Sequence, residues 1–425
     1  MRRVLAVLPL ACATLSAQVP PPTALPDHPF FIKKTWIIGG RGNWDYLTMD
    51  AAAARLYIAH GAEVQVVDVE TGNLAGEVKG MRDAHSIALD ATGEFGYVSD
   101  GAADEVKVFD RRTFEVAASI PTASAPRAIA LDPGSNLLIA ICAAPNAPNS
   151  SQQPANTDRR PGRPPQRGNP PGPPASQAPK SVITVVDTGS REELAEILIA
   201  GKLSFAQADG NGRVYIAVED RNAVARLDVE ALGTQLRRPT VGRDASPNSA
   251  TPAQAHQPQH LDWSDSARPP AGGTHIRFFS LGAGCRAPRA LAVDAKDDRV
   301  FAACGNMKMA VLDANTGNTV TALPIGPGPD AVGYDPDRSL IFTANGEAQG
   351  SLTIIRQDVT DSYAVIQTLP TRERARTLAV NSSTGQVYLV TVIEVAKVGV
   401  PPANGIGTLK MTPQDSSFQV LVVGN

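Results

Sequence analysis

The sequence has few aromatic residues, few cysteines and no large excess of either charge. Aromatic residues make up 5% of the 425 positions, the formal net charge is -3, and four cysteines are present. Proteins that bind nucleic acid or acidic membranes through bulk charge normally show a strong basic excess, and single-stranded nucleic acid also needs aromatic stacking platforms. The composition therefore argues against a nucleic-acid partner.

Motifs of common catalytic and cofactor sites are also missing. The chain contains no Gly-x-Ser-x-Gly elbow, no Walker phosphate loop, no Gly-x-Gly-x-x-Gly turn after a strand and no Cys-x-x-Cys-His haem attachment. Beyond the N-terminus, no apolar run approaches the roughly 20 residues that a membrane-spanning helix needs. The sequence predicts no membrane span, and it names no catalytic residue by motif.

The first residues, MRRVLAVLPLACATLSAQ, have the layout of an export signal, with two arginines, an apolar run and a small-residue end. We expect a cleaved signal peptide over 1–17 and a flexible segment over 18–29. A single folded domain over 30–425 would then lie in the periplasm or outside the cell. Cys12 offers lipidation as an alternative to simple cleavage.

A short pattern that ends in an acid or amide after small or apolar residues recurs along the chain. Its seven copies are Leu47–Asp50, Ile87–Asp90, Ile129–Asp132, Ala206–Asp209, Leu291–Asp294, Val332–Asp335 and Leu378–Asn381. Copies without insertions lie roughly 40 residues apart, and further short β runs follow each copy, so that one period holds four strands. One such sheet cannot bury both faces alone and must stack on its neighbours, which is typical of a propeller blade.

We therefore predict an all-β fold, a seven-bladed β-propeller of four-stranded antiparallel blades. The seventh repeat has no fourth strand after residues 418–424, whereas a surplus β run lies at about 30–40, before the first repeat. We expect this N-terminal strand to complete the last blade and close the ring. Closure would leave no open edge between the first and last blades.

Residues 97–100, Tyr-Val-Ser-Asp, stand where the YVTN (YncE-like) β-propeller repeat family has its Tyr-Val-Thr-Asn motif. The turns VVDVETG at 66–72 and VLDANTG at 311–317 are similar to that family's third-strand endings. The chain resembles this family over roughly residues 30 to 425, with insertions. The resemblance implies a secreted or periplasmic propeller from a family of mixed roles, which include ligand, surface and single-stranded DNA binding.

Two positions of the repeat should meet at one mouth of the central channel: the start of the first strand and the end of the second. Most side chains at these positions are polar, which predicts a polar funnel for a small anionic or sugar-like ligand. The candidate ligand-binding residues are Asp45, His60, His85, Asp100, Arg127, Glu219, Arg289, Asp330, Asn345 and Arg376. Ion pairs between blades, such as Asp330 with Arg376, would explain the same charges without a ligand, so both interpretations stay open.

The funnel offers two chemical centres. Three guanidinium groups could hold a carboxylate or phosphate through bidentate hydrogen bonds: Arg127, Arg289 and Arg376. Two imidazoles and two carboxylates form a set that suits zinc or a similar divalent ion: Asp45, His60, His85 and Asp100. Trp44, beside the ring of charges, is the candidate for aromatic stacking.

Three insertions interrupt the repeats, at 143–180, 233–274 and 393–415. The first is proline-rich and has no large apolar side chain, which predicts a disordered spacer, although its basic residues leave polyanion binding as an alternative. In the second, His256 and His260 have the spacing of a helical metal pair, but neighbouring prolines favour a solvated loop. The first and third should emerge at the funnel face, where they could cover it, and the second at the opposite face.

Three cysteines remain after the expected cleavage. Cys285 precedes the fifth channel strand and Cys304 ends the neighbouring strand, so a disulfide between them is geometrically plausible in an oxidising compartment. Cys142 would then be a free thiol. The alternative is three buried cysteines that act as small hydrophobes.

These observations favour a monomeric, exported, non-catalytic propeller that binds a small ligand or a protein partner through the funnel, without a cofactor. A lactonase-like hydrolase is the first alternative, in which the funnel carboxylates and histidines would orient a metal-activated water. Single-stranded DNA binding is the second alternative.

Overall fold

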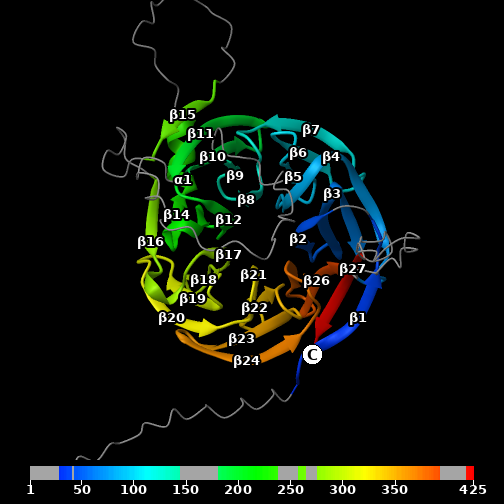
Figure 1. Cartoon of the computed structure of the whole chain (residues 1–425). Helices are drawn as coiled ribbons and strands as arrows, with labels where there is room; N and C mark the ends of the chain where they lie inside the picture. The colour runs from blue at the N-terminus through cyan, green and yellow to red at the C-terminus, as the bar shows by residue number, and fades with distance from the viewer. Residues whose placement is uncertain (1–27, 41–42, 144–179, 238–256, 265–274, 393–417) are drawn as a thin grey trace, which may run out of the picture.

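A computed structural model describes residues 28–40, 43–143, 180–237, 257–264, 275–392 and 418–425. The predicted signal peptide and most of the segment 18–29 lie outside these residues, as do nearly all of the insertions 143–180 and 393–415. Within the described residues, antiparallel sheets form a ring around a central channel, which is a β-propeller (Figure 1). No helix in this part of the chain is long and apolar enough to cross a membrane.

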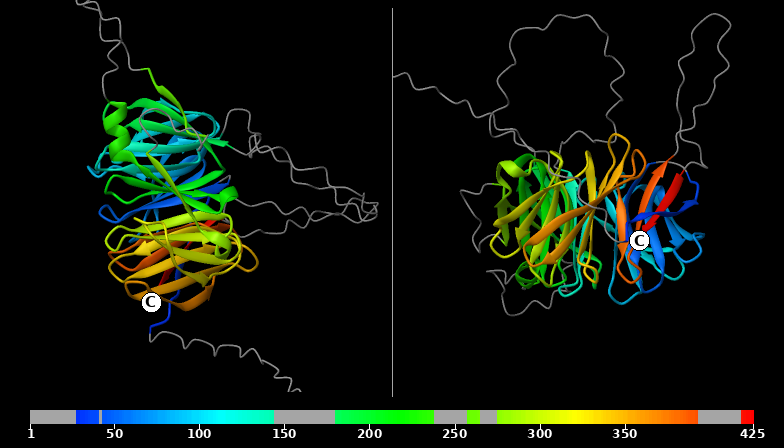
Figure 2. Two further views of the ribbon diagram at one scale, coloured as in Figure 1. Left: turned by 90° about the vertical axis from the view of Figure 1, so that its left-hand side faces the viewer. Right: turned by 90° about the horizontal axis from the view of Figure 1, so that it is seen from below.

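Three sheets contain four strands from one repeat each. The first has β12 (Leu203–Ala208), β13 (Arg213–Val218), β14 (Ala223–Asp228) and β16 (Ile276–Ser280). The second has β17 (Pro288–Asp294), β18 (Arg299–Cys304), β19 (Lys308–Asp313) and β20 (Thr319–Pro324). The third has β21 (Pro329–Asp335), β22 (Leu340–Asn345), β23 (Ser351–Val359) and β24 (Ser362–Pro370). Seen edge-on, the sheets stand side by side in one thick layer (Figure 2).

The N-terminal strand closes the ring, as predicted. The closing sheet has β25 (Leu378–Asn381), β26 (Gln386–Val392), β27 (Phe418–Gly424) and β1 (Phe31–Ile37). β1 pairs antiparallel with β27, so that Phe31 lies opposite Gly424, and the C-terminus is drawn beside β1 in Figure 1. Phe30 is 3% exposed and its ring lies 5.6 Å from that of Phe342, while its N–H donates to Gln367 Oε1 at 2.8 Å. Side chains of the neighbouring sheet therefore hold the strand as well.

The fifth sheet gains a strand from the second insertion. Its strands are β8 (Ala128–Asp132), β9 (Leu137–Ala143), β10 (Lys180–Asp187), β11 (Glu192–Ala200) and β15 (Gln259–Asp262). β15 belongs to the insertion of the next repeat and pairs in parallel with β11, whose outer edge would otherwise be open. The helix α1 (Val229–Leu236) overlaps the start of the same insertion, and Asp228 caps it by accepting from the N–H of Ala231 at 3.0 Å.

The prediction of a solvated loop around His260 is therefore wrong. His260 lies in β15, where its Nδ1 is 3.2 Å from Glu196 Oε2 on β11. The backbone of β15 pairs with the N–H and C=O groups along the outer edge of β11, and this pairing fixes the position of residues 259–262. The other member of the proposed pair, His256, lies outside the described residues.

The sixth sheet contains two consecutive repeats, so the prediction of seven separate four-stranded sheets is wrong: the structure has six sheets. Its strands are β2 (Trp44–Asp50), β3 (Arg55–Asp68), β4 (Leu74–Leu89), β5 (Phe95–Asp100), β6 (Glu105–Asp110) and β7 (Val116–Pro121). The residues that flank β3 are hydrogen-bonded to each other: the N–H of Val69 donates to the carbonyl of Ala54 at 3.1 Å. The two ends of β3 therefore lie side by side, and the strand folds back on itself. β4 pairs with β3 through its first half and with β5 through its second half, and this continuous strand joins the two repeats.

The recurring aspartates of the sequence pattern close β-turns. Asp90 Oδ1 accepts from the N–H of Gly93 at 2.9 Å, and Asp132 Oδ2 accepts from the N–H of Ser135 at 2.9 Å. Asp132 also reaches the next repeat, where its Oδ1 accepts from the N–H of Gly212 at 3.1 Å. A side-chain acceptor at this point fixes the hairpin between first and second strands, which explains why the pattern ends in Asp or Asn.

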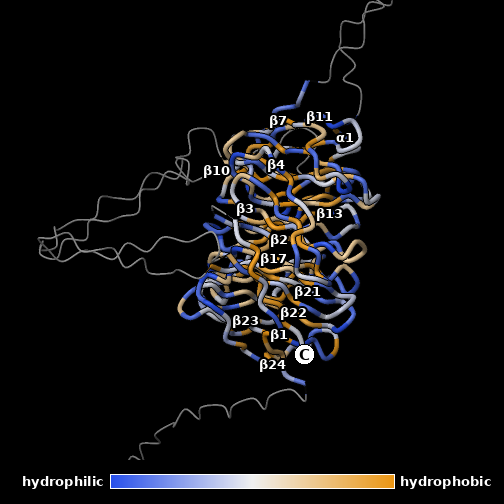
Figure 3. The backbone as a smooth tube through the Cα atoms, turned by 90° about the vertical axis from the view of Figure 1, so that its right-hand side faces the viewer, coloured by the Kyte–Doolittle hydropathy of each residue, from blue (hydrophilic) through white to orange (hydrophobic). Residues whose placement is uncertain are grey.

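Apolar side chains fill the spaces between neighbouring sheets. Figure 3 shows hydrophobic residues along the strands and hydrophilic residues at many of the turns. The tyrosines of three second strands, Tyr57, Tyr215 and Tyr388, are at most 1% exposed and lie in these interfaces. The innermost strands contact one another in the order β2, β4, β8, β12, β17, β21, β25 and again β2, which encloses the central channel.

Candidate functional site

A polar cavity of about 580 Å³ opens where the innermost strands begin, and we call it the funnel. Its charged lining residues are Asp45, Asp83, His85, Arg127, Arg289, Asp330, Glu347, Arg374 and Arg376. Six of the ten predicted ligand-binding residues are among them: Asp45, His85, Arg127, Arg289, Asp330 and Arg376. Each of these six occupies the same position of a different repeat, so the ring symmetry brings them to one rim.

Two of the remaining predicted residues are buried in structural contacts away from the funnel lining. His60 is 1% exposed, stacks on Phe418 with ring centroids 4.1 Å apart, and places Nδ1 2.9 Å from Gln65 Oε1. Asp100 is fully buried and accepts from two backbone N–H groups, those of Arg82 at 2.8 Å and of residue 83 at 2.9 Å. Both side chains therefore hold loops of the fold, which corrects their expected position.

The other two predicted residues also lie outside the funnel lining. Asn345 is fully buried, and its Nδ2 donates to Thr353 Oγ1 at 3.1 Å and to Ser351 Oγ at 3.2 Å. Glu219 pairs with Lys202 at 2.7 Å. All four residues come from the end of a second strand, which lies between the first and third strands of its sheet and so does not border the channel.

The predicted metal-binding set is not brought together. Asp45 and His85 are in contact, but His60 and Asp100 make the separate contacts described above. Across the described ranges, no group of three or more His, Cys, Asp or Glu residues is arranged to hold a metal ion. The hydrolase alternative therefore loses the ligand set on which it was based.

His85 lies between two carboxylates at the funnel wall. Its Nδ1 is 2.8 Å from Asp45 Oδ2, and its Nε2 is 3.2 Å from Asp83 Oδ2. Burial acts to lower the pKa of His85, but hydrogen bonds with the two carboxylates outweigh it and raise the pKa above its ordinary value. The hydrogen bond between His85 and Asp83 also lowers the pKa of Asp83. The two carboxylates thus stabilise the protonated form of the imidazole.

The arginines of the funnel differ in their partners. Arg376 places Nη1 3.5 Å from Asp330 Oδ2 and donates from Nη2 to the carbonyl of Trp44 at 3.1 Å, so the predicted interblade ion pair is present. Arg127 Nη2 lies 3.8 Å from Asp45 Oδ2. In the portion of the chain described here, Arg289 has no ion pair within 4.0 Å, although its charge acts on Asp330. Arg289 is therefore the guanidinium most available to a ligand.

Trp44, the candidate for aromatic stacking, is buried. It is 4% exposed, packs against Phe418 with ring centroids 5.7 Å apart, and is covered by the guanidinium of Arg374 at 4.8 Å. Both partners are distant in sequence, so no local signal indicated this burial. Trp44 supports the funnel wall and offers no open ring face.

Sequence analysis missed three charged lining residues, Asp83, Glu347 and Arg374. Asp83 and Arg374 each lie two positions before a predicted residue, His85 and Arg376. Residues two apart on an extended chain face the same side, so this alternation could have identified both. Glu347 lies in a turn after β22, where no such rule applies.

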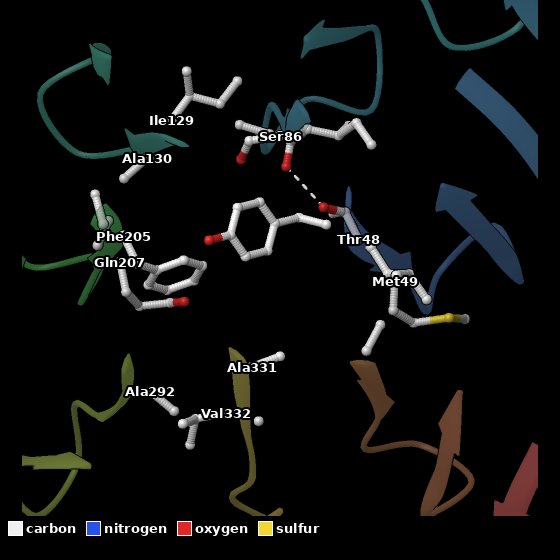
Figure 4. A pocket seen from close by; sticks show the side chains of 18 of the residues that line it. Thr48, Met49, Ser86, Ile129, Ala130, Phe205, Gln207, Ala292, Ala331 and Val332 are labelled. Carbon is white, nitrogen blue, oxygen red and sulfur yellow. Dashed lines mark hydrogen bonds between the residues drawn. The ribbon is translucent and has the colours of Figure 1, made fainter. Parts of the chain in front are cut away.

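Below the funnel, the central channel forms a second space of about 390 Å³. Tyr46 follows Asp45 along β2, and its ring lies 5.1 Å from the ring of Phe205, which projects into the channel in Figure 4. Burial raises the pKa of Tyr46 well above its ordinary value, with further increases from Asp45 and Asp330. Tyr46 therefore lies between the funnel residue Asp45 and a channel whose other lining residues are mostly small or apolar.

Seven inner strand segments line this channel, at 46–49, 86–89, 129–131, 205–208, 292–293, 331–334 and 378–380. Adjacent segments are also linked directly, because Thr48 Oγ1 donates to the carbonyl of Ile87 at 2.7 Å (Figure 4). The channel is thus enclosed by neighbouring repeats in direct contact.

The predicted disulfide between Cys285 and Cys304 is present, with a Cα–Cα distance of 5.5 Å. Cys304 ends β18 opposite Pro288 of β17, so the bond fixes the start of the strand that carries Arg289. Cys142 is a buried free thiol, and burial raises its pKa to about 12. A thiol with such a pKa is unreactive at neutral pH.

Comparisons with known proteins support the fold and no narrower assignment. No protein-family model and no curated protein matches the sequence. A chain in the crystal structure of the mitotic checkpoint complex is similar in structure, with a TM-score of 0.57 and 11% identity over 91% of this chain and 95% of that chain. As many as 1687 solved chains match in structure, so the fold does not indicate a function. The chain is a β-propeller of antiparallel sheets.

Proposed function

We propose that this chain is a non-catalytic binding propeller whose funnel takes a small ligand with an anionic group. One observation carries the proposal: charged side chains from six repeats converge on one cavity of about 580 Å³. A cavity of this size suits a small molecule, and convergent charged groups are a common mark of binding sites.

Arg289 is the expected anchor for the anionic group. Its guanidinium has no ion pair within 4.0 Å among the described residues, so binding an anion there requires no existing pair to break. Arg376 lies on the same rim, although it must share its charge with Asp330 at 3.5 Å. Two guanidinium groups near one another can hold a carboxylate or phosphate through several directed hydrogen bonds.

The test compares a triple variant, Arg127→Ala with Arg289→Ala and Arg376→Ala, against the wild type. Arg277→Ala, on the outer strand β16, is a matched control because Arg277 is exposed and far from the funnel lining. Carboxylates, phosphates and acidic sugars are screened by thermal shift, and hits are measured by calorimetry. We expect at least about tenfold weaker binding by the triple variant, or about 1.4 kcal/mol, and no change in the control. Unchanged binding by the folded triple variant would show that the ligand does not bind in the funnel.

A protein partner is the second candidate. The similar chain named above is found in a crystal structure of a protein complex, and propellers commonly present a rigid face to other proteins. Crosslinking in the native envelope, followed by comparison of the triple variant with Arg277→Ala, would show whether a partner depends on the funnel face.

We further infer that the ring has seven blades, with the six-stranded sheet counted as two. The support is the seven inner segments around the channel and the folded-back strand β3, which supplies both the second and the third strand of the first blade. We also propose that the chain belongs with the YVTN (YncE-like) propellers, on the motif residues at 97–100. An experimental density map of the ring would count the blades directly.

We propose that the protein is exported and works as a monomer. The layout of the first residues supports export, and the disulfide between Cys285 and Cys304 is typical of an oxidising compartment. The closed ring leaves no seam between first and last repeats for a second copy to occupy. N-terminal sequencing of protein from the envelope fraction, and sedimentation of the same sample, would test both statements.

A further inference from the structure

The funnel contains as many arginines as carboxylates. Four arginines and four carboxylates line it, apart from His85. The arginines are Arg127, Arg289, Arg374 and Arg376, and the carboxylates are those of Asp45, Asp83, Asp330 and Glu347. A site built for a simple anion would be expected to carry a surplus of positive charge. The balance therefore needs a different explanation.

A guanidinium without an ion pair among the described residues and the carboxylates around His85 lie on opposite sides of the funnel. Arg289 is the second residue of the inner strand β17, whereas Asp83 belongs to β4 and is connected to Asp45 of β2 through His85. In the order of inner strands around the ring, β17 is as far from β2 as the ring allows, and Figure 1 shows the two on opposite sides of the channel. A ligand in the funnel would therefore meet a guanidinium at one end and a carboxylate at the other.

Both groups keep capacity for a ligand. Arg289 has no ion pair within 4.0 Å in the part of the chain that is described. The Oδ2 of Asp83 contacts His85 at 3.2 Å, yet the Asp83 side chain is still 32% exposed. Its lowered pKa keeps Asp83 ionised at neutral pH. A guanidinium without an ion pair in the described residues thus faces a partly exposed carboxylate across the cavity.

Ligands with a single charge fit this arrangement poorly. A monoanion would gain from Arg289 but would also lie near four carboxylates, and a monocation would lie near four arginines. Unfavourable charges of this kind are a common means of rejecting the wrong ligand. A ligand that carries both charges, separated along its length, is attracted at both ends.

We propose that the funnel recognises a small zwitterion of the amino-acid class, with its carboxylate at Arg289 and its ammonium group at Asp83. This inference rests on the proposed function, because it takes the funnel as the ligand site. It adds the second recognition group and the direction in which the ligand lies.

Calorimetry on the full chain without its signal segment tests the inference with two sets of probes. The first set has one chain length and differs in charge: γ-aminobutyrate, butyrate and butylamine. The second set consists of amino acids of different length, glycine, β-alanine and 5-aminopentanoate, and it measures the best separation of charges. We expect the preferred amino acid to bind at least about tenfold more tightly than the matched acid or amine, because each end adds a charged hydrogen bond.

Two charge-neutralising variants should each remove a different preference. Arg289→Gln should remove the preference for γ-aminobutyrate over butylamine, and Asp83→Asn should remove the preference over butyrate. Thermal unfolding shows whether each variant is folded. Asp83→Ser, which removes the same carboxylate, replaces Asp83→Asn if that variant does not fold.

The outcomes separate this inference from the proposed function. If butyrate binds the wild type as tightly as every amino acid tested, the zwitterion inference is overturned and an anion site remains. If an amino acid binds but neither Arg289→Gln nor Asp83→Asn changes the preference, the assigned orientation is overturned. If neither the amino acids nor the anions of the wider panel bind, the proposed function itself fails.

Discussion

His85 Nδ1 lies 2.8 Å from Asp45 Oδ2, and this contact joins the inner strands of the first two repeats at the funnel wall. The second ring nitrogen contacts Asp83 at 3.2 Å. The imidazole is thus held from both sides, and its protonation state affects the stability of the ring at this point.

Stability should decrease as the pH rises through the folded pKa of His85. That pKa lies above the ordinary 6.5, so the added stability is fully present below pH 6.5 and is lost at higher pH. Urea unfolding of the wild type and of His85→Gln, measured from pH 6 to pH 9, checks this. The difference between the two proteins should shrink as the pH rises; a constant difference would contradict the assigned pKa direction.

Phe30→Ala should destabilise the protein by about 3 kcal/mol or more, because Phe30 is buried against Phe342 where the N-terminal strand closes the ring. The neighbouring variant Phe31→Ala is the control, since Phe31 is 52% exposed and should change stability by less than about 0.5 kcal/mol. Chemical unfolding of both variants measures the difference. Equal effects would mean that the closing strand is not anchored through Phe30.

Gly317→Ala should destabilise by about 2 kcal/mol or more. Gly317 has a φ of +78°, and an added Cβ would lie 2.1 Å from a ring carbon of Phe279 on the preceding sheet. In a Phe279→Ala background the clash disappears and only the backbone strain is left, so Gly317→Ala should cost less there. Purely additive effects of the two changes would show that the ring contact does not matter.

Loss of the disulfide should destabilise the protein by about 3 kcal/mol, because the bond closes a loop with a sequence separation of 19. Unfolding of a Cys285→Ala, Cys304→Ala double variant measures this loss. Alkylation of the unfolded, unreduced protein without residues 1–17 should label Cys142 alone. Labelling of three cysteines would show that the bond does not form.

The repeat and its ring could be predicted because their signals are local. Asp90 and Asp132 recur at fixed positions since each closes a hairpin turn with its own carboxylate. The same register placed the starts of the inner strands correctly, so Asp45 and Arg289 were assigned to one cavity from sequence alone.

The remaining predictions failed where contacts between distant segments decide the structure. His60 and Trp44 both pack against Phe418, a partner that no local pattern indicates. Likewise, the first two repeats form one sheet because β4 continues from the first repeat into the second. The sequence between these two repeats has no feature that distinguishes it from the junctions of the other repeats. The position of a residue in the repeat predicts where along a strand it lies. Whether its side chain is buried depends on the side chains that the neighbouring sheet packs against it.

The pairing of Phe31 with Gly424 has a consequence for synthesis in the cell. During translation β1 leaves the ribosome long before β27, so it must wait unpaired while every intervening repeat emerges. The ring can close only after the end of β27 has been released, and any earlier pairing of β1 with another strand would have to be reversed. Until then β1 presents unpaired backbone groups, and exposed strand edges of this kind are the usual starting point for wrong pairing and aggregation.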